Sequence, residues 1–130
     1  MSMSAAERFV SFQQGDLLIN GNDKVEIYMD ANDCRGVSYA ANALVKDIRN
    51  VSGSQATITS NRKATILVGT IGHSAAIDQL IKQKRINGNL LKGKREKFII
   101  TLVDQQLVIA GSDRRGTIYG IYELSQQMGV

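Results

Sequence analysis

Residues 108–130 read VIAGSDRRGTIYGIYELSQQMGV and combine the end of a strand, a polar loop and a helix. The apolar run 107–110 predicts the strand, and Gly111-Ser112-Asp113 predicts the loop. Apolar residues then recur at helical spacing, at Ile118, Ile121, Tyr122, Leu124 and Met128. Gly129 lies where a left-handed C-cap is expected, one residue before the sequence ends, and this ending is typical of a domain boundary.

Upstream, short apolar runs and period-two alternation predict strands at 9–12, 17–19, 25–29, 56–59, 65–69 and 98–103, with a turn at 21–23. The alternation at 25–29 is typical of a half-buried strand. The continuous run at 65–69 predicts a central strand covered on both faces. We expect 98–103 and 107–110 to form a hairpin across 104–106.

Two further helices are expected between these strands. Asp33 is the predicted cap of the first, which runs to about Val51 and ends at Gly53. Its inward face is expected to carry Val37, Ala41, Leu44, Ile48 and Val51. Ser74 is the predicted cap of the second, which runs to about Gln83 with Ile77, Leu80 and Ile81 inward. This order of strands and helices indicates α/β or α+β with a mixed sheet.

Composition sets the class of protein. With 130 residues and 43% hydrophobic content, residues 1–130 fit a single domain. The single cysteine, Cys34, excludes an intramolecular disulfide. No apolar run is long enough to span a membrane, and the first residues lack the pattern of a signal peptide, so no membrane partner is expected.

The stretch 111–122, GSDRRGTIYGIY, and the stretch 66–74, followed by Ile77-Asp78-Gln79-Leu80-Ile81, carry a family likeness. They resemble the N-terminal domain of glycoside hydrolase family 115, the xylan alpha-1,2-glucuronidases, and the region of Phe9 and Gly15-Asp16 is similar more loosely. The resemblance implies a hexosaminidase domain-2-like α+β fold, with a mixed sheet and about three helices. It also implies a periplasmic or secreted parent enzyme whose catalytic barrel and carboxylates follow Val130, so no catalytic residue is expected here.

The turn Gly72-His73-Ser74 follows a buried strand and opens a helix, which is the context of a hydrolase nucleophile elbow. A serine nucleophile needs a separate histidine as its base, and His73 is the single histidine and adjoins Ser74. We therefore expect Ser74 to be a structural cap. The turn 69–72 matches no phosphate-binding motif and is interpreted as a tight turn.

No metal or cofactor is expected, because Cys34 and His73 cannot form a zinc site without several carboxylates. Cys34 adjoins Arg35 near a helix start, a position that can lower a thiol pKa, but a buried or idle thiol is the favoured interpretation.

A basic segment covers residues 82–97, where seven basic residues against one acidic residue give a net charge of +6, compared with +4 for the whole chain. Its basic residues are Lys82, Lys84, Arg85, Lys92, Lys94, Arg95 and Lys97. Phosphate contacts use such residues, but stacking aromatics are lacking, so nucleic acid is not the favoured partner. A solvated loop around Asn87-Gly88-Asn89 is the favoured interpretation, and attraction to an acidic polysaccharide stays open.

The candidates for interdomain or ligand contact are Asp113, Arg114, Arg115, Tyr119 and Tyr122. Asp113 is expected to cap the last helix, and Gly116 and Gly120 leave a groove for close approach of another element. The two tyrosines are expected to contact the catalytic barrel of the same polypeptide.

Two function classes remain open. The first is a non-catalytic N-terminal domain of a glycoside hydrolase that reaches its polysaccharide substrate through the parent enzyme. The second is a stand-alone module that binds acidic glycan or nucleic acid through the basic segment.

Overall fold

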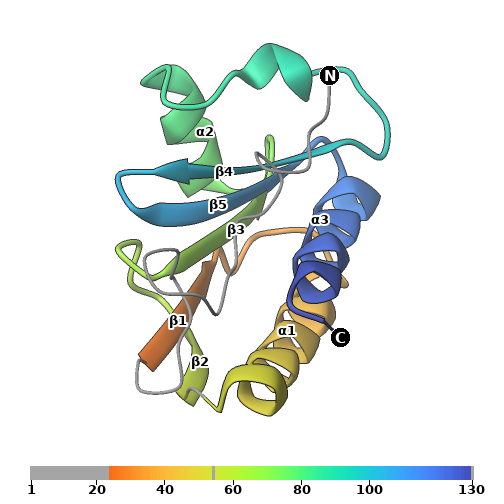
Figure 1. Ribbon diagram of the computed structural model, residues 1–130. Helices are drawn as coiled ribbons and strands as arrows, with labels where there is room; N and C mark the ends of the chain where they lie inside the picture. The colour runs from red at the N-terminus through yellow and green to blue at the C-terminus, as the bar shows by residue number, and fades with distance from the viewer. Residues whose placement is uncertain (1–23, 54, 130) are drawn as a thin grey trace, which may run out of the picture.

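The computed structural model describes residues 24–53 and 55–129 (Figure 1). The strands expected at 9–12 and 17–19 and the turn at 21–23 lie outside these residues. The elements are β1 (Lys24–Met29), α1 (Val37–Ser52), β2 (Gln55–Thr59), β3 (Ile66–Thr70), α2 (Ala75–Lys82), the short 3₁₀ helix η1 (Gly88–Leu90), β4 (Phe98–Val103), β5 (Gln106–Gly111) and α3 (Arg114–Gln127).

The five strands form one mixed sheet in the order β2-β1-β3-β5-β4. β1 runs parallel to β2 and β3, β3 runs parallel to β5, and only β4 is antiparallel, to β5. β3 is the middle strand and all five of its residues are buried, which confirms the prediction from its continuous apolar run. The α+β class, with a mixed sheet and three α-helices, is likewise confirmed.

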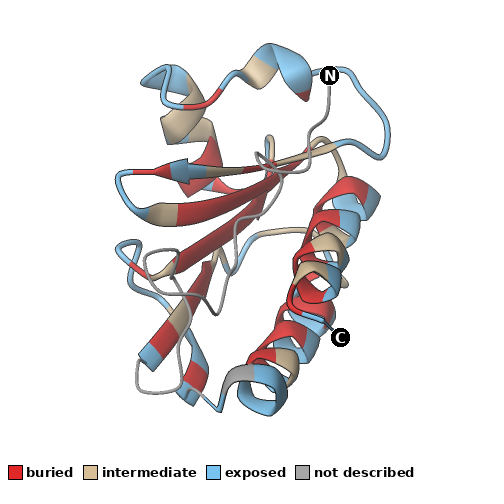
Figure 2. Cartoon of the chain, in the orientation of Figure 1, coloured by how far each residue is buried: buried red, intermediate tan, exposed pale blue. Residues whose placement is uncertain are grey.

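The helices cover both faces of the sheet. α1 and α3 lie side by side on one face, and α2 lies against the other (Figure 1). A hydrophobic core lies on each face of the sheet, and alternate residues of β3 pack into one or the other. Ile66 and Val68 face α1 and α3, whereas Leu67 faces α2. The prediction of a half-buried β1 is wrong at its end, where Tyr28 is buried on the α2 side. Figure 2 shows the buried strands between exposed outer helix surfaces.

The first turn of α1 differs from the sequence prediction. Its N-cap is Gly36, with a left-handed φ of 94° and no side-chain hydrogen bond, so Asp33 does not cap the helix. Val51, expected inward, is 37% exposed, while Ala40 and Val45 complete the buried face. Gly53 does end the helix, in a left-handed conformation.

The hairpin between β4 and β5 is tighter than expected. Its turn consists of Asp104 and Gln105, both with positive φ, as a two-residue type I′ turn requires. Gln106 therefore belongs to β5, opposite Val103, and the expected loop 104–106 is one residue too long.

α3 crosses the sheet at close range because its inner face carries glycines. A Cβ at Gly116 would overlap the backbone oxygen of Lys97, and a Cβ at Gly120 would lie 2.7 Å from Cγ2 of Ile109. The parts of the chain that approach these two glycines thus belong to this domain: Lys97 lies just before β4, and Ile109 lies in β5. Gly129, with a φ of 95°, follows the helix in the expected left-handed conformation.

Candidate functional site

The loops that follow β1, β3 and β5 meet at the carboxyl-terminal edge of the sheet, where these parallel strands end. They enclose an open hollow of about 520 Å³ that is lined by Cys34, Arg35, His73, Asp113, Arg114 and Arg115. The chain leaves β1 toward α1 on one face and leaves β3 toward α2 on the other. Ligands of open α/β sheets bind at such a divergence, outside the carboxyl ends of the strands. We call this feature the arginine hollow.

Two aspartates of the loop after β1 tie this loop to the end of β3 and to the segment that follows it through backbone amides. Asp33 accepts hydrogen bonds from the backbone nitrogens of Cys34 (2.6 Å) and Thr70 (3.0 Å). Asp30 accepts one from the nitrogen of Ala75, at the start of α2 (3.2 Å). These carboxylates therefore hold the loops in place and are already engaged.

Two buried threonines add a second connection. The hydroxyl oxygens of Thr70 and Thr117 lie 2.7 Å apart, and both side chains are fully buried. The Thr117 hydroxyl also donates to the backbone oxygen of Asp113 at 3.1 Å. This pair joins the end of β3 to the first turn of α3, and no local sequence pattern marks it.

Asp113 caps α3, as predicted. Its Oδ1 accepts a hydrogen bond from the Gly116 nitrogen at 2.8 Å, and its Oδ2 accepts one from the Glu96 nitrogen at 3.0 Å. The Gly116 bond is the main reason that the pKa of Asp113 lies below its ordinary value, and the Glu96 bond and the charge of Arg115 lower it further. Asp113 therefore remains ionised and is unsuited to act as a proton donor.

The Cys34 thiol shows no activation. Burial raises its pKa above the ordinary value, and the adjacent Asp33 charge raises it further. The possibility that Arg35 lowers this pKa is thus wrong, and the interpretation of an idle thiol agrees with the raised value.

The arginines differ in their partners. Arg115 forms an ion pair with Glu96 at 3.5 Å. The side chain of Arg114 lies beside α1, 3.9 Å from the position that a Cβ would take on Gly36. Neither Arg114 nor Arg35 forms an ion pair with a described residue. Sequence reasoning singled out Arg114 and Arg115 but did not propose Arg35 as a site residue.

Tyr119 and Tyr122, the other predicted contact residues, do not line the arginine hollow. They lie further along α3 on its outer face and are 43% and 52% exposed. The structure therefore separates the predicted set into a polar edge at 113–115 and an aromatic surface on α3.

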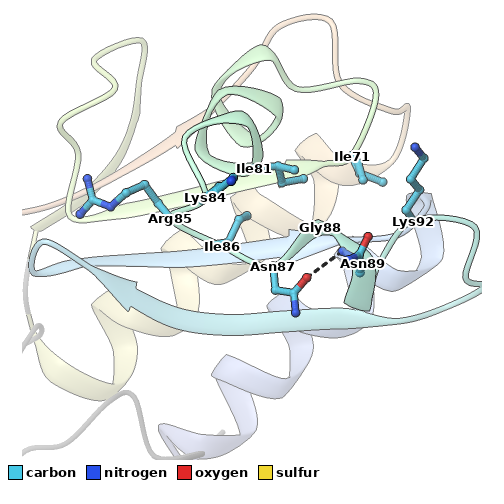
Figure 3. A pocket seen from close by; sticks show the side chains of 9 residues that line it. All are labelled: Ile71, Ile81, Lys84, Arg85, Ile86, Asn87, Gly88, Asn89 and Lys92. Atoms are coloured by element: carbon cyan, nitrogen blue, oxygen red, sulfur yellow. Dashed lines mark hydrogen bonds between the residues drawn. The ribbon is translucent and has the colours of Figure 1, made fainter.

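The basic segment lines a different hollow, of about 680 Å³, at the end of α2 (Figure 3). Lys84, Arg85 and Lys92 border it, and Arg85 forms an ion pair with Asp104 of the hairpin turn. Isoleucines, asparagines and Gly88 complete the lining, and no aromatic side chain from the described part of the chain takes part. This arrangement does not favour the stacking expected of a nucleic-acid site.

Ser74 is a buried helix cap. Its Oγ accepts a hydrogen bond from the Ile77 nitrogen at 3.3 Å. We expect Ser74→Ala to lower the free energy of unfolding by about 0.5–2 kcal/mol, the usual loss for such a cap. Urea unfolding of the variant measures this loss, and Ser74→Thr, which keeps a hydroxyl, serves as the comparison. A hydrolytic activity that disappears in Ser74→Ala at unchanged stability would contradict the structural role.

Over residues 24–53 and 55–129, no three His, Cys, Asp or Glu side chains come close enough to hold a metal ion. In the same part of the chain, no helix has the length and apolar character needed to cross a membrane.

The chain matches the family described as the N-terminus of glycosyl hydrolase family 67 over residues 18–124. No curated protein matches it. It is similar to a solved structure of BtGH115A, described as a novel family GH115 4-O-methyl-alpha-glucuronidase with specificity for decorated arabinogalactans. The two share 35% identity with a TM-score of 0.75, and the match covers 86% of this chain and 14% of that one. The structure of CpGH84D, at 11% identity, supports the fold alone, with a TM-score of 0.62 over 82% of this chain and 18% of that one.

Proposed function

Since this chain belongs to the glycosyl hydrolase family 67 N-terminal family and is the N-terminal domain of a GH115-like enzyme, we propose that it is a non-catalytic part of a longer glucuronidase. The chain spans about 14% of the GH115 structure that it resembles, so most of such an enzyme lies in other domains. The proposed reaction of the full polypeptide is release of (4-O-methyl)glucuronic acid from a polysaccharide. Xylan is one candidate for this polysaccharide, because of the sequence resemblance. A decorated arabinogalactan is another, because of the description of BtGH115A.

The observation that carries the non-catalytic role is the engagement of the carboxylates around the arginine hollow. Glycoside hydrolysis by the usual mechanism needs two carboxyl groups that flank the scissile bond, one of them a proton donor with a raised pKa. Asp30 and Asp33 are bound by backbone amides of neighbouring loops. Asp113 has the opposite pKa shift from that of a proton donor. These groups stabilise the loops, and within residues 24–53 and 55–129 they leave no acid and base pair at this edge.

We expect the 130-residue chain to release no glucuronic acid from glucuronoxylan or from a glucuronate-bearing arabinogalactan, and the full polypeptide to release it from one of them. The expected difference reflects catalytic carboxylates that lie in another domain. Release is measured by chromatography of the free sugar acid, and incubation without protein is the control. Turnover by the 130-residue chain that one Asp or Glu substitution abolishes would contradict the proposal.

The proposed partner of this domain is the catalytic domain of the same polypeptide, and the proposed contact is the outer face of α3. Tyr119 and Tyr122 are both exposed there. Tyrosine is enriched at protein interfaces because its ring buries apolar area while its hydroxyl forms hydrogen bonds. The basic segment, with Arg85 already paired to Asp104 and no aromatic lining, gives less support to a stand-alone binding module.

A further inference from the structure

We propose that the arginine hollow binds the carboxylate group of an acidic sugar, with Arg35 and Arg114 as the principal ligands. The two arginines come from loops that follow different strands, β1 and β5, and they line one hollow. The choice of an acidic sugar rests on the proposed function, whereas the binding of an anion rests on the charges of the hollow itself.

The charges that line the hollow are unequal. Arg35, Arg114 and Arg115 stand against Asp113 alone, because the other lining side chains, Cys34 and His73, carry no negative charge. Glu96 lies nearby but forms its ion pair with Arg115. Arg35 and Arg114, both exposed, thus border one hollow without an ionic partner among the described residues, and their guanidinium groups are available to an anion that enters it.

An aspartate of this edge could supply that anion only by turning toward the arginines, and this movement would break its hydrogen bonds. Asp33 would lose its bonds to the nitrogens of Cys34 and Thr70, and Asp113 would lose its bonds to those of Gly116 and Glu96. Each move would leave backbone donors of the loops without their hydrogen-bond partners. Asp33 and Asp113 are thus held by these amides, and neither forms an ion pair with Arg35 or Arg114.

The chemistry of the lining favours a carboxylate on a sugar ring. The guanidinium group presents a planar fork that binds a carboxylate in bidentate fashion. The hollow, of about 520 Å³, is open to solvent, so a sugar can enter it from outside. Among the described residues, no Phe, Tyr or Trp lines the hollow for stacking of a base, so a nucleotide is disfavoured. His73 adds a ring that can bond to a sugar hydroxyl.

The hollow is also distant from the last turn of α3. It borders the first turn of α3, and Gly129 follows the last turn of this 14-residue helix, about 20 Å away. A substitution in the hollow can thus be tested without altering the last turn of the helix.

The experiment is a titration of the 130-residue chain with methyl α-glucuronide, followed by NMR, with methyl α-glucoside as the uncharged counterpart. The two probes differ only in the carboxylate. We expect shifts of backbone and arginine side-chain signals around 35, 73 and 113–115 with the glucuronide alone, and weaker binding at high salt. Arg35→Gln and Arg114→Gln should each weaken binding about tenfold, as expected for loss of one charge-assisted contact. Lys46→Gln, an exposed charge change on α1, should leave binding unchanged.

Glucuronide binding that follows this pattern supports the site. Equal response to both probes, or binding that neither arginine substitution weakens, would overturn it. Absence of glucuronide binding in this chain would also overturn it. If Arg35→Gln and Arg114→Gln instead weaken association with the separately produced catalytic domain and not glucuronide binding, the hollow is an interdomain contact and the proposal is wrong. Turnover is a separate readout, so a failure here leaves the non-catalytic role to its own test.

Discussion

Gly116→Ala is expected to lower the free energy of unfolding by about 3 kcal/mol or more, a large part of the 5–15 kcal/mol that stabilises a typical domain. Helix propensity alone predicts the opposite sign, because alanine in a helix is favoured over glycine by about 1 kcal/mol. The steric term prevails since a Cβ at 116 would overlap the backbone oxygen of Lys97. That backbone cannot retreat easily, because Lys97 exchanges hydrogen bonds with Ser112 at 2.8 Å and 3.0 Å.

Two comparison variants separate this clash from other effects. Gly120→Ala should cost less, because a Cβ at 120 would lie 2.7 Å from Cγ2 of Ile109, a milder overlap than that with the backbone oxygen of Lys97. Gln126→Ala, on the exposed face of α3, should change stability by less than about 0.5 kcal/mol. Urea unfolding monitored by circular dichroism compares the three with the parent chain. Equal stability of Gly116→Ala and the parent would contradict the close approach of α3 to Lys97.

The parts of the fold that sequence could predict depend on local patterns. The continuous apolar run of β3 predicted a strand covered on both faces, and the polar residues Ser74 and Asp113 predicted the starts of α2 and α3. Each signal acts within one element, through side-chain burial or a cap three residues away, so neighbouring residues suffice to reveal it.

The errors arise where distant segments decide the local structure. Asp33 has the composition of a cap, but its carboxylate bonds to Thr70, 37 residues away, so α1 starts later, at a glycine. Val51 continues the helical spacing, yet it is 37% exposed and lies outside the buried face of α1. Local spacing cannot predict either result.

The candidate site was predicted only in part for the same reason. The polar run 113–115 is contiguous, and sequence alone marked it. Arg35 and His73 join it because β1, β3 and β5 are neighbours and parallel, which aligns their carboxyl ends at one edge. That strand order comes from packing across the whole sheet, so no spacing along the chain reports it.

Labelling of Tyr119 and Tyr122 by hydroxyl radicals is expected to fall by roughly fivefold or more between the 130-residue chain and the full polypeptide, since the core of an interface packs as densely as a protein interior. All four tyrosines of the chain serve as reporters. In the short chain, Tyr39, Tyr122 and Tyr119 should be labelled, being 79%, 52% and 43% exposed, and Tyr28, at 7%, should not. Tyr39 lies on α1, outside the proposed contact, so its labelling should be similar in both proteins.

A stability comparison distinguishes burial in an interface from a general change in the domain. Replacing Tyr119 and Tyr122 together by Asp should lower the melting temperature of the full polypeptide more than that of the 130-residue chain, because only the longer protein would have to bury the new charges. Tyr39→Asp should have similar effects in both. Equal labelling of Tyr119 and Tyr122 in the two proteins, with equal losses of stability, would mean that no partner covers the outer face of α3. The exposed tyrosines would then be ordinary surface residues, and the catalytic domain would have to contact this one through another face.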